Sequence, residues 1–310
     1  MTAVVEAELL EPRSSSRGIW RDTLGNILRQ RNAIVGLTIL VFLLLTAVFA
    51  DQLATHDPDH PLFGVVEGVK KSSPPCIHAL GCPADQPELI MGTDSNVRDV
   101  FSRVVHGARI SLFVGFATVG FAIVIGTLIG LVAGFAGGWV DNLLMRLMDI
   151  LLVFPALLLA IAIVAALGQS LTNAQLAIAI VAIPIYARIM RASVLTVKES
   201  DFVTASRALG ESPGGILFRR VLPNAITPLI VAGTLGIGGA VLDVAALSFL
   251  GYGAQPPTAE WGSMIGLESG RIFTAPHLIF FPGLALVLTV FGFNLLGDGL
   301  RDALDPRLNR

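Results

Sequence analysis

The chain has 310 residues, of which 54% are hydrophobic and 14% are charged, and its mean hydropathy is +0.74. Soluble domains typically carry about 25% charged residues, so this composition indicates an integral membrane protein. The formal net charge of -2 provides no basic field for nucleic acid, and two cysteines are too few for a fold built on disulfides.

The N-terminal segment 1–32 mixes polar and charged residues ahead of the first apolar run. Its beginning has no apolar core, so it does not predict a cleavable signal peptide. The run that follows, 33–50, is long enough to remain in the bilayer as an anchor. We therefore expect a cytoplasmic tail at 1–32 and the first transmembrane helix at 33–50.

Five further uncharged runs follow, at roughly 110–134, 143–167, 174–187, 225–250 and 278–297. Backbone groups in lipid must bond within their own segment, which favours helices, and the sequence lacks the short alternating segments of a β-barrel. The second run is dense in glycine, which we interpret as close helix packing rather than gating. Its glycines are Gly115, Gly120, Gly126, Gly130 and Gly134. Pro155, Pro184 and Pro282 predict kinks. The sequence thus predicts an all-α integral membrane protein with six transmembrane helices.

Lysine and arginine predict the orientation, because they concentrate on the cytoplasmic side of a membrane. With the N-terminus inside and six crossings, 15 of the 21 Lys and Arg residues lie on that side. Both termini are then cytoplasmic, and 51–109 is an extracytoplasmic segment. The remaining membrane domain, 110–297, includes a cytoplasmic segment at 188–224, and 298–310 is a cytoplasmic tail.

The extracytoplasmic segment contains Cys76 and Cys82, on the side where disulfides persist. Their spacing can close a loop, so we favour a bridge, with two free thiols as the alternative. His56 and His60 flank an acidic turn, which we interpret as a solvated loop rather than a metal site.

Asp243 is the one acid well inside an apolar run. An unpaired charge in lipid costs at least about 2.5 kcal/mol, so the side chain should face the bundle interior or a wet cavity. Two interpretations stay open: a helix–helix hydrogen bond or interfacial position, and a residue of the translocation pathway that meets the cationic amino end of a peptide.

The cytoplasmic segment 188–224 contains a short amphipathic pattern. Ser200 or Asp201 can cap a helix, and Gly210 can end it. The apolar face of this helix consists of Phe202, Ala205, Ala208 and Leu209. Such a helix suits docking into a groove on a partner.

This segment resembles the EAA loop of ATP-binding-cassette import permeases. The matching residues are Thr204-Ala205-Ser206, Gly210 and Leu222-Pro223. That family usually has an acidic residue where Thr204 stands and alanine where Ser206 stands. The resemblance implies that the helix couples to a cytoplasmic ATPase, with Asp201 and Arg207 as its polar contacts. The coupling residues would be Asp201, Phe202, Thr204, Ala205, Ser206, Arg207, Ala208, Leu209 and Gly210.

Three more segments resemble the C-type permease of the dipeptide, oligopeptide and nickel branch of that family. They are Gly92-Thr93-Asp94 with Arg98-Asp99 and Arg103, then Leu247 to Gly262, and the ending Gly297 to Leu308. The resemblance runs from about residue 20 to the end and implies the type I importer (MetI-like) fold with an extra N-terminal helix. An extracytoplasmic insert at about 57–90 is longer than that branch usually has.

The sequence contains no GxxxxGK[ST] loop, no HExxH and no GxSxG carrying a nucleophile. We therefore expect no enzyme activity and no cofactor or metal bound by this chain. The resemblance implies that two ATPase subunits use ATP and Mg, beside a second permease subunit and an extracytoplasmic substrate-binding protein, in a prokaryotic plasma membrane. Peptides are the first choice of substrate, with nickel or glutathione-like ligands behind them. A secondary transporter is the rival class, but it would tend to show inverted repeats.

Overall fold

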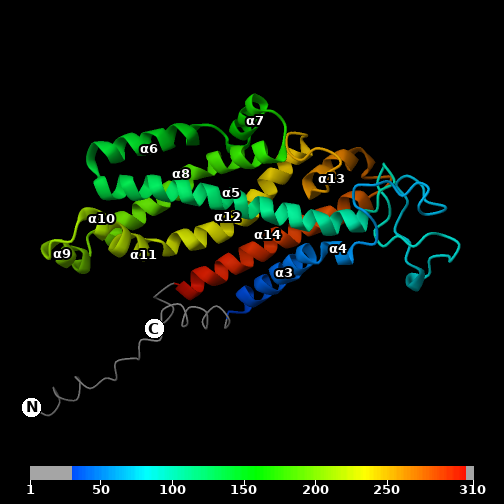
Figure 1. Cartoon of the computed structure of the whole chain (residues 1–310), viewed down its shortest axis with the longest axis horizontal. Helices are drawn as coiled ribbons and strands as arrows, with labels where there is room; N and C mark the ends of the chain where they lie inside the picture. The colour runs from blue at the N-terminus through cyan, green and yellow to red at the C-terminus, as the bar shows by residue number, and fades with distance from the viewer. Residues whose placement is uncertain (1–29, 305–310) are drawn as a thin grey trace, which may run out of the picture.

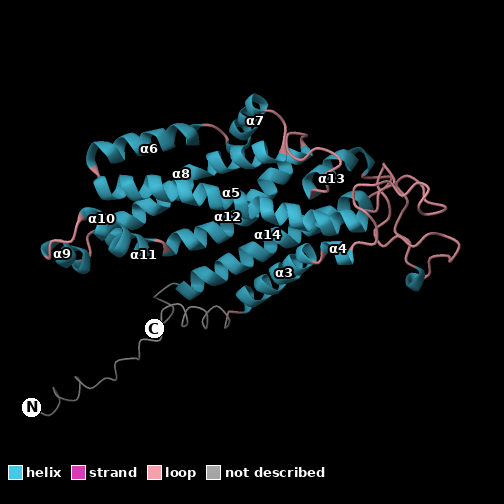
Figure 2. Cartoon of the chain, in the orientation of Figure 1, coloured by secondary structure: helices cyan, strands magenta, loops and turns pink. Residues whose placement is uncertain are grey.

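The computed structural model describes residues 30–304, and within them it contains helices, loops and two isolated bridges but no strand (Figures 1 and 2). Five helices are long and apolar enough to cross a membrane: α3 (Arg31–Val48), α5 (Val100–Ala136), α8 (Leu171–Val197), α12 (Thr227–Phe249) and α14 (His277–Leu304). The all-α membrane fold is therefore confirmed. Most of the predicted tail 1–32 and the sequence match after Leu304 lie outside the described residues.

The predicted span 143–167 is broken at Pro155, where the sequence predicted a kink. The structure has two helices there, α6 (Gly138–Val153) and α7 (Ala156–Leu167), bent by 92° relative to each other. Phe154 between them is extended, with φ -85° and ψ 140°, because a proline disfavours helical geometry in the residue before it. The sixth span exists only if this bent pair is one crossing. Pro184 and Pro282, in contrast, lie inside helices that continue past them.

Two helices extend beyond their uncharged runs. α5 begins at Val100 rather than 110, with Asp99 as its N-cap accepting a hydrogen bond from Ser102 N at 2.9 Å. α8 continues to Val197 rather than ending at 187. A search for uncharged runs ends a predicted helix at its first arginine. The helix itself can continue past that arginine when a carboxylate pairs with it, as the ion pairs between α6 and α8 described below show.

Glycine allows α5 and α8 to pack closely. A Cβ at Gly130 would lie 2.3 Å from the carbonyl oxygen of Ala187, and one at Gly126 or Gly134 would also clash with α8. A Cβ at Gly120 would meet open space. These contacts fit the packing interpretation of the glycine run.

The last helix packs against the first in the same way. A Cβ at Gly36 of α3 would lie 2.7 Å from the backbone of α14 at Gly292, and one at Gly299 would lie 2.4 Å from Ala33. Figure 1 shows α3 and α14 side by side.

Short elements gather at the two ends of the bundle (Figure 1). One end holds α9 (Asp201–Ala208), α10 (Pro213–Gly215), the π-helix η2 (Ile216–Val221) and α11 (Leu222–Ala225). The other end holds the loops of the insert with α4 (Ala50–Leu53), η1 (His78–Leu80), α13 (Trp261–Glu268) and η3 (Ser269–Arg271). These two ends carry the candidate sites.

Candidate functional site

The helix α9 begins and ends where the residue types predict. It starts at Asp201 after the N-cap Ser200, whose hydroxyl donates back to the carbonyl of Val197 instead of capping the helix. Gly210 follows the helix with φ +80°, a conformation that glycine adopts without a Cβ penalty. Two backbone bonds of 3.1 Å, from Gly210 N to Arg207 O and from Glu211 N to Ser206 O, close the turn.

One side of α9 faces its own chain. Val203 and Ser206 are buried, and Val203 belongs to the same apolar cluster as Ile216 and Val221 of η2. This side fixes the helix to the bundle, and it leaves the predicted docking residues on the opposite side.

The other side of α9 is exposed. Leu209 is 88% exposed and Phe202 44%, values far above those of a packed core residue. The remaining predicted coupling residues on this side, Thr204, Ala205, Arg207 and Ala208, are exposed as well. Asp201 and Arg207 make no ion pair among residues 30–304. The structure therefore brings the predicted coupling residues onto one solvent-facing surface, except Ser206, which is buried.

Two ion pairs connect α6 to the half of α8 that leads into α9, and the sequence interpretation missed both. Arg191 donates to Asp141 through two nitrogens at 2.5 and 2.6 Å, and Arg188 donates to Asp149 at 2.5 Å. The available signal was a pair of carboxylates eight residues apart, placed before two arginines three residues apart. These contacts hold the bent α6–α7 segment against the helix that leads into α9.

Asp243 lies on α12, half-buried. Within the described residues it makes no hydrogen bond and no ion pair. The helix–helix hydrogen bond considered from the sequence is therefore not made inside this part of the chain. The carboxylate is available to a ligand, to water or to another subunit.

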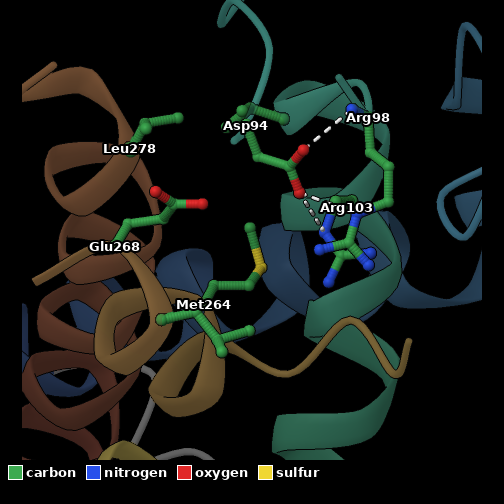
Figure 3. A pocket seen from close by; sticks show the side chains of 8 residues that line it. Asp94, Arg98, Arg103, Met264, Glu268 and Leu278 are labelled. Carbon is green, nitrogen blue, oxygen red and sulfur yellow. Dashed lines mark hydrogen bonds and ion pairs between the residues drawn. The ribbon is translucent and has the colours of Figure 1, made fainter. Parts of the chain in front are cut away.

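At the end of the bundle that holds the insert, a buried charge cluster joins two of the segments that resembled the peptide and nickel branch (Figure 3). Asp94 Oδ2 accepts from Arg98 Nε at 2.7 Å, and the Nε of Arg103 lies 3.8 Å from the same oxygen. Arg103 also donates to the carbonyl oxygen of Pro257, in the loop that follows α12, at 3.1 Å. Segments about 160 residues apart thus meet in space.

The insert contains both cysteines, and the structure joins Cys76 and Cys82 in a disulfide with Cα atoms 5.4 Å apart. Near it, Cys76 pairs through its backbone with Leu89, which is buried together with Leu62 and Val97. The two histidines considered for a metal, His56 and His60, belong to no metal-binding group among the described residues.

Two family models match the chain. Residues 126–310 match the binding-protein-dependent transport system inner membrane component, and residues 18–75 match the N-terminal transmembrane domain of oligopeptide transport permease C.

Curated relatives span nearly the full length. The dipeptide transport system permease protein DppC of Alkalihalophilus pseudofirmus is 45% identical over 93% of this chain and 90% of its own length. The di/tripeptide transport system permease protein DppC of Pseudomonas aeruginosa is 45% identical over 90% of this chain and 89% of its own length. The glutathione transport system permease protein GsiD of Pectobacterium atrosepticum is 40% identical over 95% of this chain and 93% of its own length.

The fold has a solved counterpart. A chain of the MetNI methionine ABC transporter in an inward-facing conformation matches with a TM-score of 0.55 and 21% identity, covering 66% of this chain and 97% of that chain. This likeness supports the MetI-like fold. The chain belongs to the family of binding-protein-dependent transport system inner membrane components, and it is a multi-pass permease subunit of an ATP-binding-cassette importer rather than an enzyme.

Proposed function

We propose that this chain forms half of a peptide translocation pathway and is driven by cytoplasmic ATPases through α9. The exposed face of α9 is the observation that carries the proposal. It presents an apolar stripe flanked by Asp201 and Arg207, which lack ion-pair partners in the described chain. An exposed apolar face of this kind, bounded by unpaired charges, suits a groove on another protein.

The proposed assembly contains a second permease subunit, two ATPase subunits that use ATP and Mg, and an extracytoplasmic substrate-binding protein. We place both termini and α9 in the cytoplasm of a prokaryotic cell, because most lysines and arginines then lie inside. The insert and α13 then face outward, toward the binding protein. Membrane lipid surrounds the remaining apolar surface.

The proposed mechanism is alternating access. ATP closes the ATPase pair, α9 moves with it, and the pathway opens toward the binding protein. Each state must be stabilised by contacts that the other lacks. The face of α9 supplies such contacts on the ATPase side, since the buried side of α9 packs against η2 and the opposite side is exposed.

The proposed substrates are di- or oligopeptides. The relatives named above are called dipeptide, di/tripeptide and glutathione permeases, and all of these cargoes contain peptide bonds. Asp243 would meet the cationic amino end of a peptide, because it is a half-buried carboxylate without a partner in the described chain. Nickel is the alternative cargo.

Proteoliposomes holding the complete transporter and its binding protein test the proposal. We expect dipeptide uptake that requires ATP on the side of the vesicle membrane where the ATPase subunits lie. This uptake should stop when the ATPase subunits are left out. Asp243→Asn should lower uptake of peptides with a free amino end more than uptake of N-acetylated ones. Uptake by the chain without any ATPase would contradict the proposed class, and uptake of nickel but not peptides would contradict the proposed cargo.

A further inference from the structure

The outer end of α12 forms one unit with the loop 250–260 and α13. A Cβ at Gly262 would lie 2.3 Å from Ala245 O, and one at Gly266 would lie 2.6 Å from Phe249 O, so α13 packs directly on the last turns of α12. Ser248 Oγ accepts a hydrogen bond from Ala254 N at 3.1 Å, which ties the loop to the helix. We call residues 245–268 the outer hairpin.

Two arginines, held together by one aspartate, bond the outer hairpin to the start of α5. We call Asp94, Arg98 and Arg103 the outer clamp; they are 5%, 5% and 1% exposed. Arg103 donates to the carbonyls of Pro257 and Thr258 at 3.1 and 3.5 Å, and Arg98 reaches the carbonyl of Pro257 at 3.5 Å. Asp94 supplies the negative charge that both guanidinium groups face (Figure 3).

Neighbouring bonds strengthen the attachment. Trp261 Nε1 donates to Val104 O at 2.9 Å, and Glu268 Oε1 accepts from Ser95 Oγ at 2.6 Å. Glu268 lies across a small pocket from the clamp (Figure 3). Buried charges tolerate little displacement, because a charge that loses its partner stays desolvated. The outer hairpin is therefore held at a fixed place on α5.

The inner end of α12 is attached differently. It begins at Thr227, after the short helix α11 and the π-helix η2. η2 packs against the buried side of α9 through Ile216 and Val221. Residues 216–226 share an apolar cluster with α5, but among the described residues no ion pair links them to it, and Arg220 pairs with Glu211 instead. A displacement of α9 can thus reach the inner end of α12 while the outer end stays in place.

We propose that Arg103 is a positioning residue for transport, because it makes the outer clamp the fixed point about which a displacement of α9 turns α12. This inference rests on the proposed function of α9. If the fixed point is lost, ATP hydrolysis should continue, but less of the displacement should reach the pathway. The defect should therefore appear as more ATP consumed for each peptide imported.

The test uses the complete transporter with its binding protein in proteoliposomes, and measures ATP hydrolysed and dipeptide imported in the same vesicles. Arg103→Met keeps the aliphatic bulk but removes the donors to Pro257 and Thr258, together with the donor to Pro58 O in the insert. We expect at least a fivefold rise in ATP per peptide, with the KM for ATP within twofold of the parent. Arg103→Lys keeps the charge beside Asp94, so its ratio of ATP hydrolysed to peptide imported should rise less.

Arg109→Met is the matched control, because Arg109 lies on the same helix but bonds the end of α3 and Asp51 instead of the outer hairpin. Arg109→Met should leave the ratio of ATP hydrolysed to peptide imported within twofold of the parent's value. An unchanged ratio in both Arg103 variants, or an equal rise in the control, would overturn the inference. If Arg103→Met does not assemble, the Arg103→Lys ratio decides. A parent complex that imports no peptide would instead contradict the proposed function.

Discussion

The two ends of the helix bundle carry charge in opposite ways. At the end that holds the insert, Asp94, Arg98 and Arg103 are buried and bonded to one another and to backbone carbonyls. At the end that holds α9, Asp201 and Arg207 are exposed and have no ion-pair partner in the described residues. A buried pair is completed within the chain, whereas an exposed unpaired charge is available to another subunit. The outer residues should therefore determine the stability of the chain itself, and the residues of α9 the stability of the complex.

Asp94→Ala should give the largest loss of stability. It leaves two buried guanidinium groups without their carboxylate, and breaking a buried pair costs about 3–5 kcal/mol. The measurement is unfolding of the purified chain in detergent. Asp59→Ala is the control, because the side chain of Asp59 is 46% exposed and lies 3.6 Å from Arg103, so its removal should cost about 0–1 kcal/mol. Equal losses in the two variants would remove the distinction between buried and exposed pairs.

Gly130→Ala should have the next largest effect. The added Cβ would lie 2.3 Å from Ala187 O, so α5 and α8 must separate, at a cost of about 1–3 kcal/mol. Because this packing joins the outer clamp on α5 to the helix that leads into α9, the variant should weaken both ends. Gly120→Ala is the control on the same helix: its Cβ meets open space, and the lower flexibility of alanine should stabilise the chain by about 0.5–1 kcal/mol. In the same unfolding assay, Gly130→Ala should lower the stability and Gly120→Ala should raise it. An equal loss of stability in both variants would show that close packing is not the cause.

Arg207→Glu should leave the chain as stable as the parent, within about 0.5 kcal/mol, because the side chain is exposed and unpaired. Binding of the ATPase subunits should weaken by about tenfold, or roughly 1.4 kcal/mol, when measured by titration. Arg301→Glu reverses a charge on exposed Arg301 of α14, away from α9, and serves as the control. Unchanged ATPase affinity in Arg207→Glu would remove α9 as the coupling helix.

Cys76→Ser with Cys82→Ser should have the smallest effect on both ends. The bridge closes the short loop 76–82 of the insert, and this loop makes no hydrogen bond or ion pair to the outer hairpin or to α9 among the described residues. Mass spectrometry of the unreduced parent should find it lighter by two hydrogens than the reduced form. Free thiols in the parent would contradict the bridge, and a loss of stability as large as that of Asp94→Ala would contradict the independence of the loop 76–82.

Much of the fold follows from the sequence, because membrane helices leave a strong signal in long apolar runs. The start of α9 and its end before Gly210 also follow from local residue types. Helix limits were less predictable where an arginine is neutralised from a distant segment, as Arg191 is by Asp141. The break at Pro155 was predicted as a kink, but the 92° bend depends on packing that no local pattern contains.

The residues of the candidate sites also differ in how far the sequence could predict them. The exposed stripe of α9 could be read from spacing, because a short helix places residues three and seven apart on one face. The outer clamp could not, because Arg103 meets Pro257 across more than 150 residues. The sequence marked both segments as similar to one family without indicating that they touch.

The packing of α3 on α14 also bears on how the protein is made. Gly36 and Gly292 contact each other although they lie 256 positions apart, so α3, the first of the described helices to leave the ribosome, needs α14, the last of them, as its neighbour. At a synthesis rate of about 5–20 residues per second, the interval between the two is roughly 13–50 s. During that time the face of α3 around Gly36 must be covered by lipid or by an insertion factor, and a nascent chain stalled before α14 would leave it open to recognition by quality-control proteases.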